Sequence, residues 1–107
     1  MAPKEIYNVV KLVPKPGKFN EIAEAFRTLS KYIEDYEPKT QIYFALQPQG
    51  AEEFVFVEKY TDAENLKEHA SSLAFKQFSK ALGGCLAQAP EIKRAAFIGG
   101  FEGRAKL

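Results

Sequence analysis

Residues 54–60 read Phe54-Val55-Phe56-Val57-Glu58-Lys59-Tyr60, a run rich in β-branched and aromatic residues. Such a run predicts a β-strand, whose successive side chains point to opposite faces of a sheet. One face would carry Phe54, Phe56 and Tyr60, and the other would carry Val55 and Val57. Because both faces are apolar, each of them needs a cover that excludes water.

The residues before this strand alternate between strand and helix patterns. A strand over residues 42–46 joins it through Pro48-Gln49-Gly50, whose composition predicts a hairpin turn. Residues 6–13 predict a further strand that ends at Pro14. Between these strands, a helix runs from Lys18 to Glu37-Pro38, because the residue before a proline avoids helical geometry. The inward stripe of this helix consists of Phe19, Ile22, Ala23, Phe26, Leu29, Ser30 and Ile33.

The residues after the strand predict two more helices and a last strand. Asp62 is the expected N-cap of a short helix that reaches His69. Ser71 or Ser72 opens the next helix, which Gly83-Gly84 weakens, and residues 91–101 predict the last strand. The inward side of that second helix carries Phe75, Phe78, Leu82 and Leu86. The order β-α-β-β-α-β predicts an α+β, ferredoxin-like fold with an antiparallel sheet, in a single domain over residues 1–107.

The two faces of this sheet would not be covered equally. Right-handed crossovers place the helices on one side of the sheet, so the other apolar face stays bare within one chain. A second copy that packs sheet to sheet would cover it, at about 25 cal/mol per Å² of apolar surface removed from water. We therefore expect a homodimer that forms through the sheet face.

Composition excludes several classes of protein. The chain has 15 basic and 14 acidic residues without a basic stripe, which argues against binding to nucleic acid. No stretch is long and apolar enough to span a membrane, and the start of the chain does not resemble a signal segment. A lone cysteine, Cys85, suits a reducing compartment, so we expect a cytoplasmic protein. The alternative is import into peroxisomes, because Ala105-Lys106-Leu107 is close to the Ser-Lys-Leu address.

A few polar residues lie among apolar ones and are the candidates for chemistry. His69 shares the inward side of its helix, and Glu58 shares a strand face with Phe56 and Tyr60. Tyr43 and Asn8 are the other candidates; each of the four could instead be an ordinary packed or hydrogen-bonded core residue. Together they would suit a largely apolar pocket between sheet and helices that accepts a flat aromatic molecule. The aromatic side chains expected to contact such a molecule are Phe56, Tyr60 and Phe75.

The sequence resembles the antibiotic biosynthesis monooxygenase family of dimeric α/β barrels over about residues 6–87. The resemblance is carried by the motifs Pro16-Gly17-Lys18, Glu37-Pro38-Lys39-Thr40 before Ile42-Tyr43, Glu58-Lys59-Tyr60-Thr61-Asp62, and His69-Ala70-Ser71-Ser72 before Phe75-Lys76. Lys39 stands where the family usually has glycine. The resemblance implies a dimer of ferredoxin-like subunits that oxidises phenols or quinols with O2, without metal, flavin or haem.

A haem-degrading branch of that family has an asparagine, a tryptophan and an axial histidine, at positions that correspond here to Val10, His69 and Ser79. Because the axial ligand and the tryptophan are absent, we expect no haem, and a single histidine also argues against an ordinary zinc site.

The leading hypothesis is a cofactor-independent monooxygenase that acts on a small aromatic phenol, quinol or anthrone-like compound. We expect His69 to transfer a proton, Glu58 to meet His69 and fix its tautomer, and Tyr43 to hydrogen-bond a substrate oxygen. Asn8, Tyr60, Phe56 and Phe75 would bind the substrate. The alternatives are a non-catalytic ligand-binding or stress-associated dimer, and a non-redox cyclase or isomerase that uses His69 as acid and base.

Overall fold

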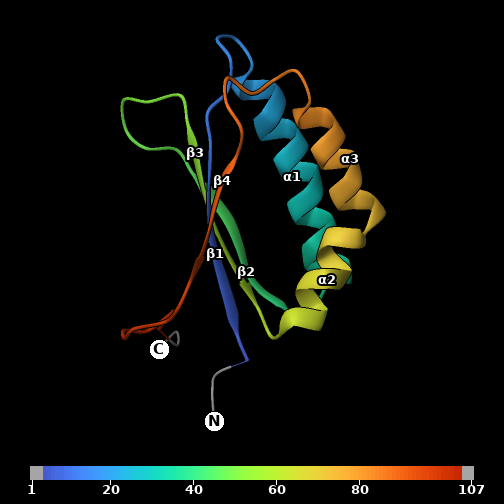
Figure 1. Cartoon of the computed structure of the whole chain (residues 1–107), viewed down its shortest axis with the longest axis vertical. Helices are drawn as coiled ribbons and strands as arrows, with labels where there is room; N and C mark the ends of the chain where they lie inside the picture. The colour runs from blue at the N-terminus through green and yellow to red at the C-terminus, as the bar shows by residue number, and fades with distance from the viewer. Residues whose placement is uncertain (1–3, 105–107) are drawn as a thin grey trace.

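The computed structural model describes residues 4–104 and consists of a four-stranded sheet with three helices on one side (Figure 1). The elements are β1 (Ile6–Leu12), α1 (Phe19–Tyr36), β2 (Thr40–Leu46), β3 (Phe54–Tyr60), α2 (Ala63–Ser71), α3 (Leu73–Leu82) and β4 (Glu91–Ala95). The strand order is β2-β3-β1-β4, and each neighbouring pair is antiparallel. The ferredoxin-like α+β fold predicted from the sequence is confirmed.

Capping side chains set the boundaries of the two short helices. Asp62 accepts a hydrogen bond from the Asn65 backbone amide at 2.8 Å and so begins α2, as predicted. Ser72 ends α2 and begins α3: its hydroxyl donates to the His69 carbonyl at 2.9 Å and accepts from the Phe75 amide at 3.1 Å. This break turns the chain between the two helices and fixes the end of α2 that carries His69.

The core lies between the helices and one face of the sheet. The predicted stripe of α1 is buried there through Ile22, Ala23, Phe26, Leu29 and Ile33. The ring of Phe26 lies at its centre, 4.5 Å from the Phe56 ring and 5.5 Å from the Tyr43 ring, measured between centroids. Aromatic contacts of this kind hold α1 against β2 and β3.

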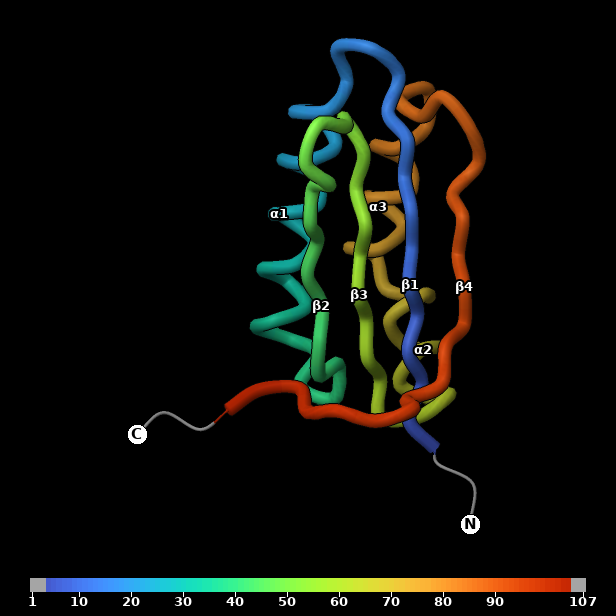
Figure 2. Tube along the Cα trace, turned by 90° about the vertical axis from the view of Figure 1, so that its left-hand side faces the viewer, coloured from blue at the N-terminus to red at the C-terminus, as the bar shows by residue number. Residues whose placement is uncertain are grey.

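The last strand is shorter than predicted. β4 ends at Ala95 rather than at residue 101, because Ala95 pairs with Tyr7 and β1 begins only one residue earlier, at Ile6. Beyond Ala95 the chain crosses the end of the helix-free sheet face (Figure 2). There the Phe97 ring stacks on the Tyr7 ring at 6.1 Å, and Glu102 forms an ion pair with Lys59.

The sheet face away from the helices is apolar and open, as the sequence predicts. Val9, Phe44 and Leu46 are 38%, 45% and 58% exposed, and Val57 lies between Val9 and Phe44 in the register of the sheet. We call the side chains of Val9, Phe44, Leu46, Val55 and Val57 the bare face. All three helices lie on the opposite side of the sheet in Figure 2.

None of the helices within residues 4–104 is long and apolar enough to cross a membrane. The tripeptide Ala105-Lys106-Leu107 lies outside the described residues, so the peroxisomal address stays a prediction.

Candidate functional site

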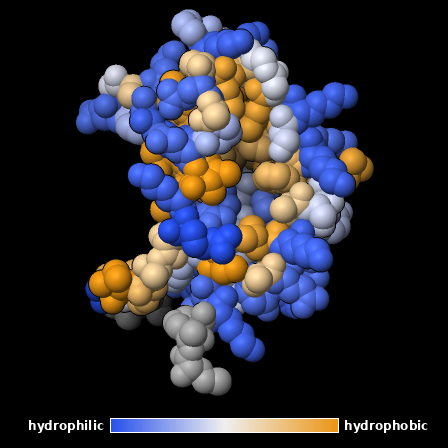
Figure 3. All heavy atoms as spheres, in the orientation of Figure 1, coloured by the Kyte–Doolittle hydropathy of each residue, from blue (hydrophilic) through white to orange (hydrophobic). Residues whose placement is uncertain are grey.

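A cavity of about 310 Å³ lies between the sheet and helices α2 and α3. The sheet forms its floor, and side chains of the two helices form its roof, among them Leu66, Phe78 and Leu82. Pro90 and Ile92 also line it, and since all five residues of β4 are exposed, the cavity opens beside this strand. Figure 3 shows a hollow between the two layers that is bordered by hydrophobic residues.

The floor of the cavity contains one polar row that crosses all four strands. Tyr43 pairs with Glu58, Glu58 pairs with Asn8, and Asn8 pairs with Arg94. Residues paired in this way point to the same face of a sheet, so all four side chains lie on the helix-facing side. The Arg94 guanidinium donates from Nε to Asn8 Oδ1 at 3.2 Å, at the open edge of the sheet.

The neighbouring row of the floor is apolar. Phe56 pairs with Val10, and Val10 pairs with Ile92. Phe75 completes this part of the cavity from α3. A bound molecule would therefore meet hydrogen-bonding groups along one edge and hydrocarbon along the rest of its surface.

Glu58 is buried in the polar row and is held by a tyrosine rather than by the histidine. The Tyr60 hydroxyl donates to Glu58 Oε1 at 2.7 Å, and Tyr60 itself is 0% exposed. Burial raises the pKa of Glu58 above its ordinary value, while hydrogen bonds from Tyr60 and Asn8 partly oppose the rise. The expected contact between Glu58 and His69 is therefore wrong.

His69 faces the cavity from α2, and its partner is Glu37. The two atoms His69 Nδ1 and Glu37 Oε1 are 3.1 Å apart, and the His69 side chain is 3% exposed. Burial lowers the pKa of His69, and the carboxylate of Glu37 opposes that effect. With Nδ1 directed at a carboxylate, the neutral ring keeps its proton there and leaves the lone pair of Nε2 for the cavity.

Three aromatic rings fix the orientation of this imidazole. The centroids of the Tyr43 and Tyr60 rings are each 5.3 Å from that of His69, and the Phe75 ring is 4.9 Å away. Burial, followed by the negative charges of Glu58 and Glu37, raises the pKa of Tyr43 well above its usual value. The Tyr43 phenol therefore stays protonated near neutral pH and can donate a hydrogen bond.

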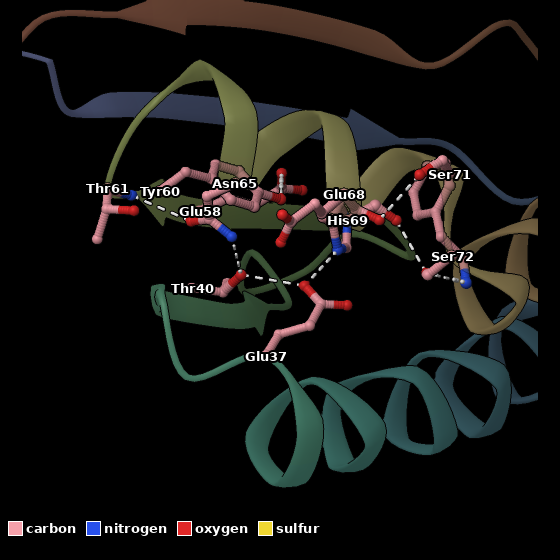
Figure 4. Close-up of polar contacts among 11 residues, drawn as sticks. Glu37, Thr40, Glu58, Tyr60, Thr61, Asn65, Glu68, His69, Ser71 and Ser72 are labelled. Atoms are coloured by element: carbon pink, nitrogen blue, oxygen red, sulfur yellow. Dashed lines mark hydrogen bonds and ion pairs between the residues drawn. The ribbon is translucent and has the colours of Figure 1, made fainter.

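Sequence reasoning missed Glu37, which belongs to a buried polar network (Figure 4). Glu37 Oε1 also accepts from the Thr40 hydroxyl at 3.0 Å, and the Asn65 side-chain amide donates to Thr40 Oγ1 at 3.3 Å. One signal could have revealed it. A glutamate at the C-terminal end of a helix meets the negative end of the helix dipole, which costs stability unless another contact compensates.

Most of the predicted site residues lie around one cavity. His69, Glu58, Tyr43, Asn8, Phe56 and Phe75 all line it. Tyr60 does not line it, but contacts two residues that do, Glu58 and His69. Ile92 and Ser79 line the cavity but were not predicted, since they depend on where β4 and α3 are placed. Within residues 4–104, no three His, Cys, Asp or Glu side chains gather as a metal site would require.

The chain is similar in sequence to one known protein family. The sequence profile of the family described as Antibiotic biosynthesis monooxygenase matches residues 5–81. No curated protein sequence matches this chain closely enough to count as a relative.

Several solved structures share the fold. A protein of Caulobacter crescentus that carries the name of the same family is 26% identical, with a TM-score of 0.84, over 91% of this chain and 92% of its own. A conserved protein of Methanosarcina mazei is also 26% identical, with a TM-score of 0.79, over 87% and 92%. A Mycobacterium tuberculosis protein at 15% identity, with a TM-score of 0.83 over 92% and 99%, shows the fold alone.

Proposed function

The chain belongs to the antibiotic biosynthesis monooxygenase family, and we propose that it oxidises a small aromatic phenol, quinol or anthrone with O2 and without a cofactor. The observation that carries this proposal is the buried His69, which lines a largely apolar cavity and is paired on its other side with Glu37. A buried base next to hydrocarbon walls suits a substrate that has one acidic edge and flat apolar rings.

The size of the cavity, and the polar and apolar rows of side chains on its floor, favour an aromatic substrate over a sugar or a phosphate ester. A volume of about 310 Å³ is at the lower end of the range for ligand pockets. Phe56 and Phe75 offer ring surfaces, while Tyr43 and Asn8 offer hydrogen bonds on one side only. A molecule with hydroxyl groups all around would leave most of them unpaired against hydrocarbon, which costs binding free energy.

The reaction that this arrangement supports begins with proton removal. His69 Nε2 takes a proton from an activated ring CH2 group, and the electron pair of the broken C–H bond stays on the aromatic substrate. Tyr43 and Asn8 donate hydrogen bonds to the substrate oxygen, over which the negative charge is delocalised. Proton removal makes the substrate electron-rich enough to pass an electron to O2.

The remaining steps balance atoms and electrons without another reactant. The substrate radical and superoxide join into a peroxide, which forms one C–O bond. The outer oxygen of the peroxide takes up one proton, and the O–O bond then breaks as the second hydrogen of that carbon is lost as a proton, so that the carbon becomes a carbonyl. The leaving hydroxide receives one proton, so that CH2 and O2 yield C=O and water.

The test is O2 consumption by the purified protein with a panel of anthrones and hydroquinones. His69→Ala should lower turnover by about 10²–10⁴-fold, because a placed acid–base group contributes about that much. Ser71→Ala is the matched control, since Ser71 is exposed on the same helix and should leave turnover unchanged. Full activity of a folded His69→Ala variant would refute the role of His69 as the base.

The same pair would also serve a cyclase or isomerase, because acid–base chemistry alone needs no O2. Conversion of a substrate under anaerobic conditions, with loss of activity in His69→Ala, would favour that second function. Binding of aromatic compounds without any conversion would favour a non-catalytic ligand-binding or stress-associated dimer.

We also propose that two copies pair through the bare face, each subunit being one domain over residues 1–107. Phe44 and Leu46 are about half exposed although they are large apolar residues, which is costly in water. The cavity lies on the opposite side of the sheet, so pairing leaves its opening beside β4 accessible.

A further inference from the structure

A second, smaller cleft lies next to Glu37. It has a volume of about 130 Å³ and is lined by Tyr36, Glu37, Pro38, Lys39, Asn65 and Glu68. His69 lines the large cavity but not this cleft, whereas Glu37 lines the cleft but not the large cavity. Glu37 therefore stands between the imidazole and a separate opening to solvent.

The carboxylate of Glu37 is only partly satisfied by hydrogen bonds. Oε1 contacts His69 Nδ1 and accepts from Thr40, but Oε2 is buried and has no partner among residues 4–104. Buried carboxylate oxygens normally accept hydrogen bonds, so an orphan oxygen calls for an explanation. Its lone pairs remain available to take a proton.

We propose that Glu37 relays protons between His69 and water in the cleft beside Pro38. When His69 Nε2 accepts a proton from the substrate, the Nδ1–H bond breaks and its proton passes to Glu37 Oε1. The carboxyl group then releases this proton to water in the cleft and returns to the carboxylate. The inference deepens the proposed function and rests on it.

A route of this kind is needed because a bound substrate fills the apolar cavity. While it is bound, the proton on His69 lies next to the substrate anion and would otherwise return to it. Transfer of the Nδ1 proton to Glu37 leaves a neutral imidazole, which is a far weaker acid than the imidazolium and therefore keeps the Nε2 proton until the O–O bond breaks. The charged or titratable groups around this path are Tyr36 from α1, His69 and Glu68 from α2, Lys39 before β2, Tyr43 from β2, and Glu58 and Tyr60 from β3.

The first experiment uses the fact that the chain contains a single histidine, so its imidazole NMR signals need no assignment. Glu37→Gln keeps the size of the side chain but cannot carry a proton. Exchange of the imidazole Nδ1 proton with water should therefore slow by about 10-fold or more. Glu68→Gln is the matched control, because it removes a carboxylate from the same cleft that makes no contact with His69.

The second experiment is chemical rescue. Glu37→Ala enlarges the cleft and should lower turnover of an anthrone by about 10–100-fold. Formate should restore turnover in a saturable manner, whereas formamide, which has the same shape but cannot carry the proton, should not. Equal rescue by formamide, or unchanged Nδ1 exchange in Glu37→Gln, would overturn the relay. Because the NMR measurement needs no substrate, it remains decisive even if the wild type oxidises none of the compounds.

Discussion

The hydrogen bond from Tyr60 to Glu58 allows a quantitative test of the polar row. Its donor and acceptor oxygens are 2.7 Å apart, and both residues are buried. A hydrogen bond to a charged group contributes about 1.5–3 kcal/mol to stability, against about 0.5–1.5 kcal/mol for a neutral pair. Tyr60→Phe should therefore cost about 2–3 kcal/mol at pH 9, which lowers the melting temperature by roughly 10 °C.

The free-energy cost of Tyr60→Phe should depend on pH, because Glu58 gains or loses its charge as the pH changes. Burial raises the pKa of Glu58 above its ordinary value of 4.5, so the folded state binds this proton more tightly than the unfolded state does. Wild-type stability should then fall as pH rises from about 4.5 through the raised pKa. At pH 4 the carboxyl group is mostly protonated in both states, and Tyr60→Phe should cost only about 1 kcal/mol.

The assay is urea unfolding of the wild type, Tyr60→Phe, Glu58→Gln and the double variant at pH 4 and pH 9. All four proteins are compared at one concentration, because the stability of the proposed dimer would depend on it. The coupling energy between the two positions should reach about 1–2 kcal/mol at pH 9 and vanish at pH 4. A Tyr60→Phe cost that is equal at both pH values would show that Glu58 is not ionised in the folded protein, and would refute this reasoning.

Three further predictions concern the dimer, the base and the absence of a cofactor. Val57→Asp places a charge in the centre of the bare face and should shift the mass in light scattering from dimer to monomer, while Thr28→Asp on the exposed side of α1 should not. Since burial lowers the pKa of His69, the acidic limb of kcat/KM against pH should lie below 6.5, and a limb at a higher pH would contradict the proposed base. EDTA should leave O2 consumption unchanged, and the purified protein should be colourless; a visible haem or flavin band would contradict this prediction.

The fold was largely predictable because its signals are local. The stripe of α1 and the alternation along β1 and β3 can be read from spacing alone, and they gave the correct faces for Asn8 and Glu58. The length of β4 was not predictable in this way, because a strand ends where its partner ends, here near Tyr7 of β1.

The site was predictable only as a set of inward-facing residues. Strand parity placed Tyr43 and Glu58 on the cavity side, but it could not show which carboxylate would meet His69. That contact joins the end of α1 to the end of α2, two segments whose relative position is set by tertiary packing. The unfavourable position of Glu37 at the end of α1 was the one local sign of it.

The exposed position of β4 determines where the protein tolerates substitutions near the cavity. Ile92 lines the cavity from β4, and Arg94 on the same strand contacts Asn8 of the floor. Because all five residues of β4 are exposed, replacing these two disturbs little of the core. Exposed substitutions of this kind usually alter stability by less than about 0.5 kcal/mol. Mutations on β4 can therefore alter which small molecules enter the cavity while the His69–Glu37 pair stays in place. During selection for binding of a different molecule, substitutions on this strand would therefore cost the least stability.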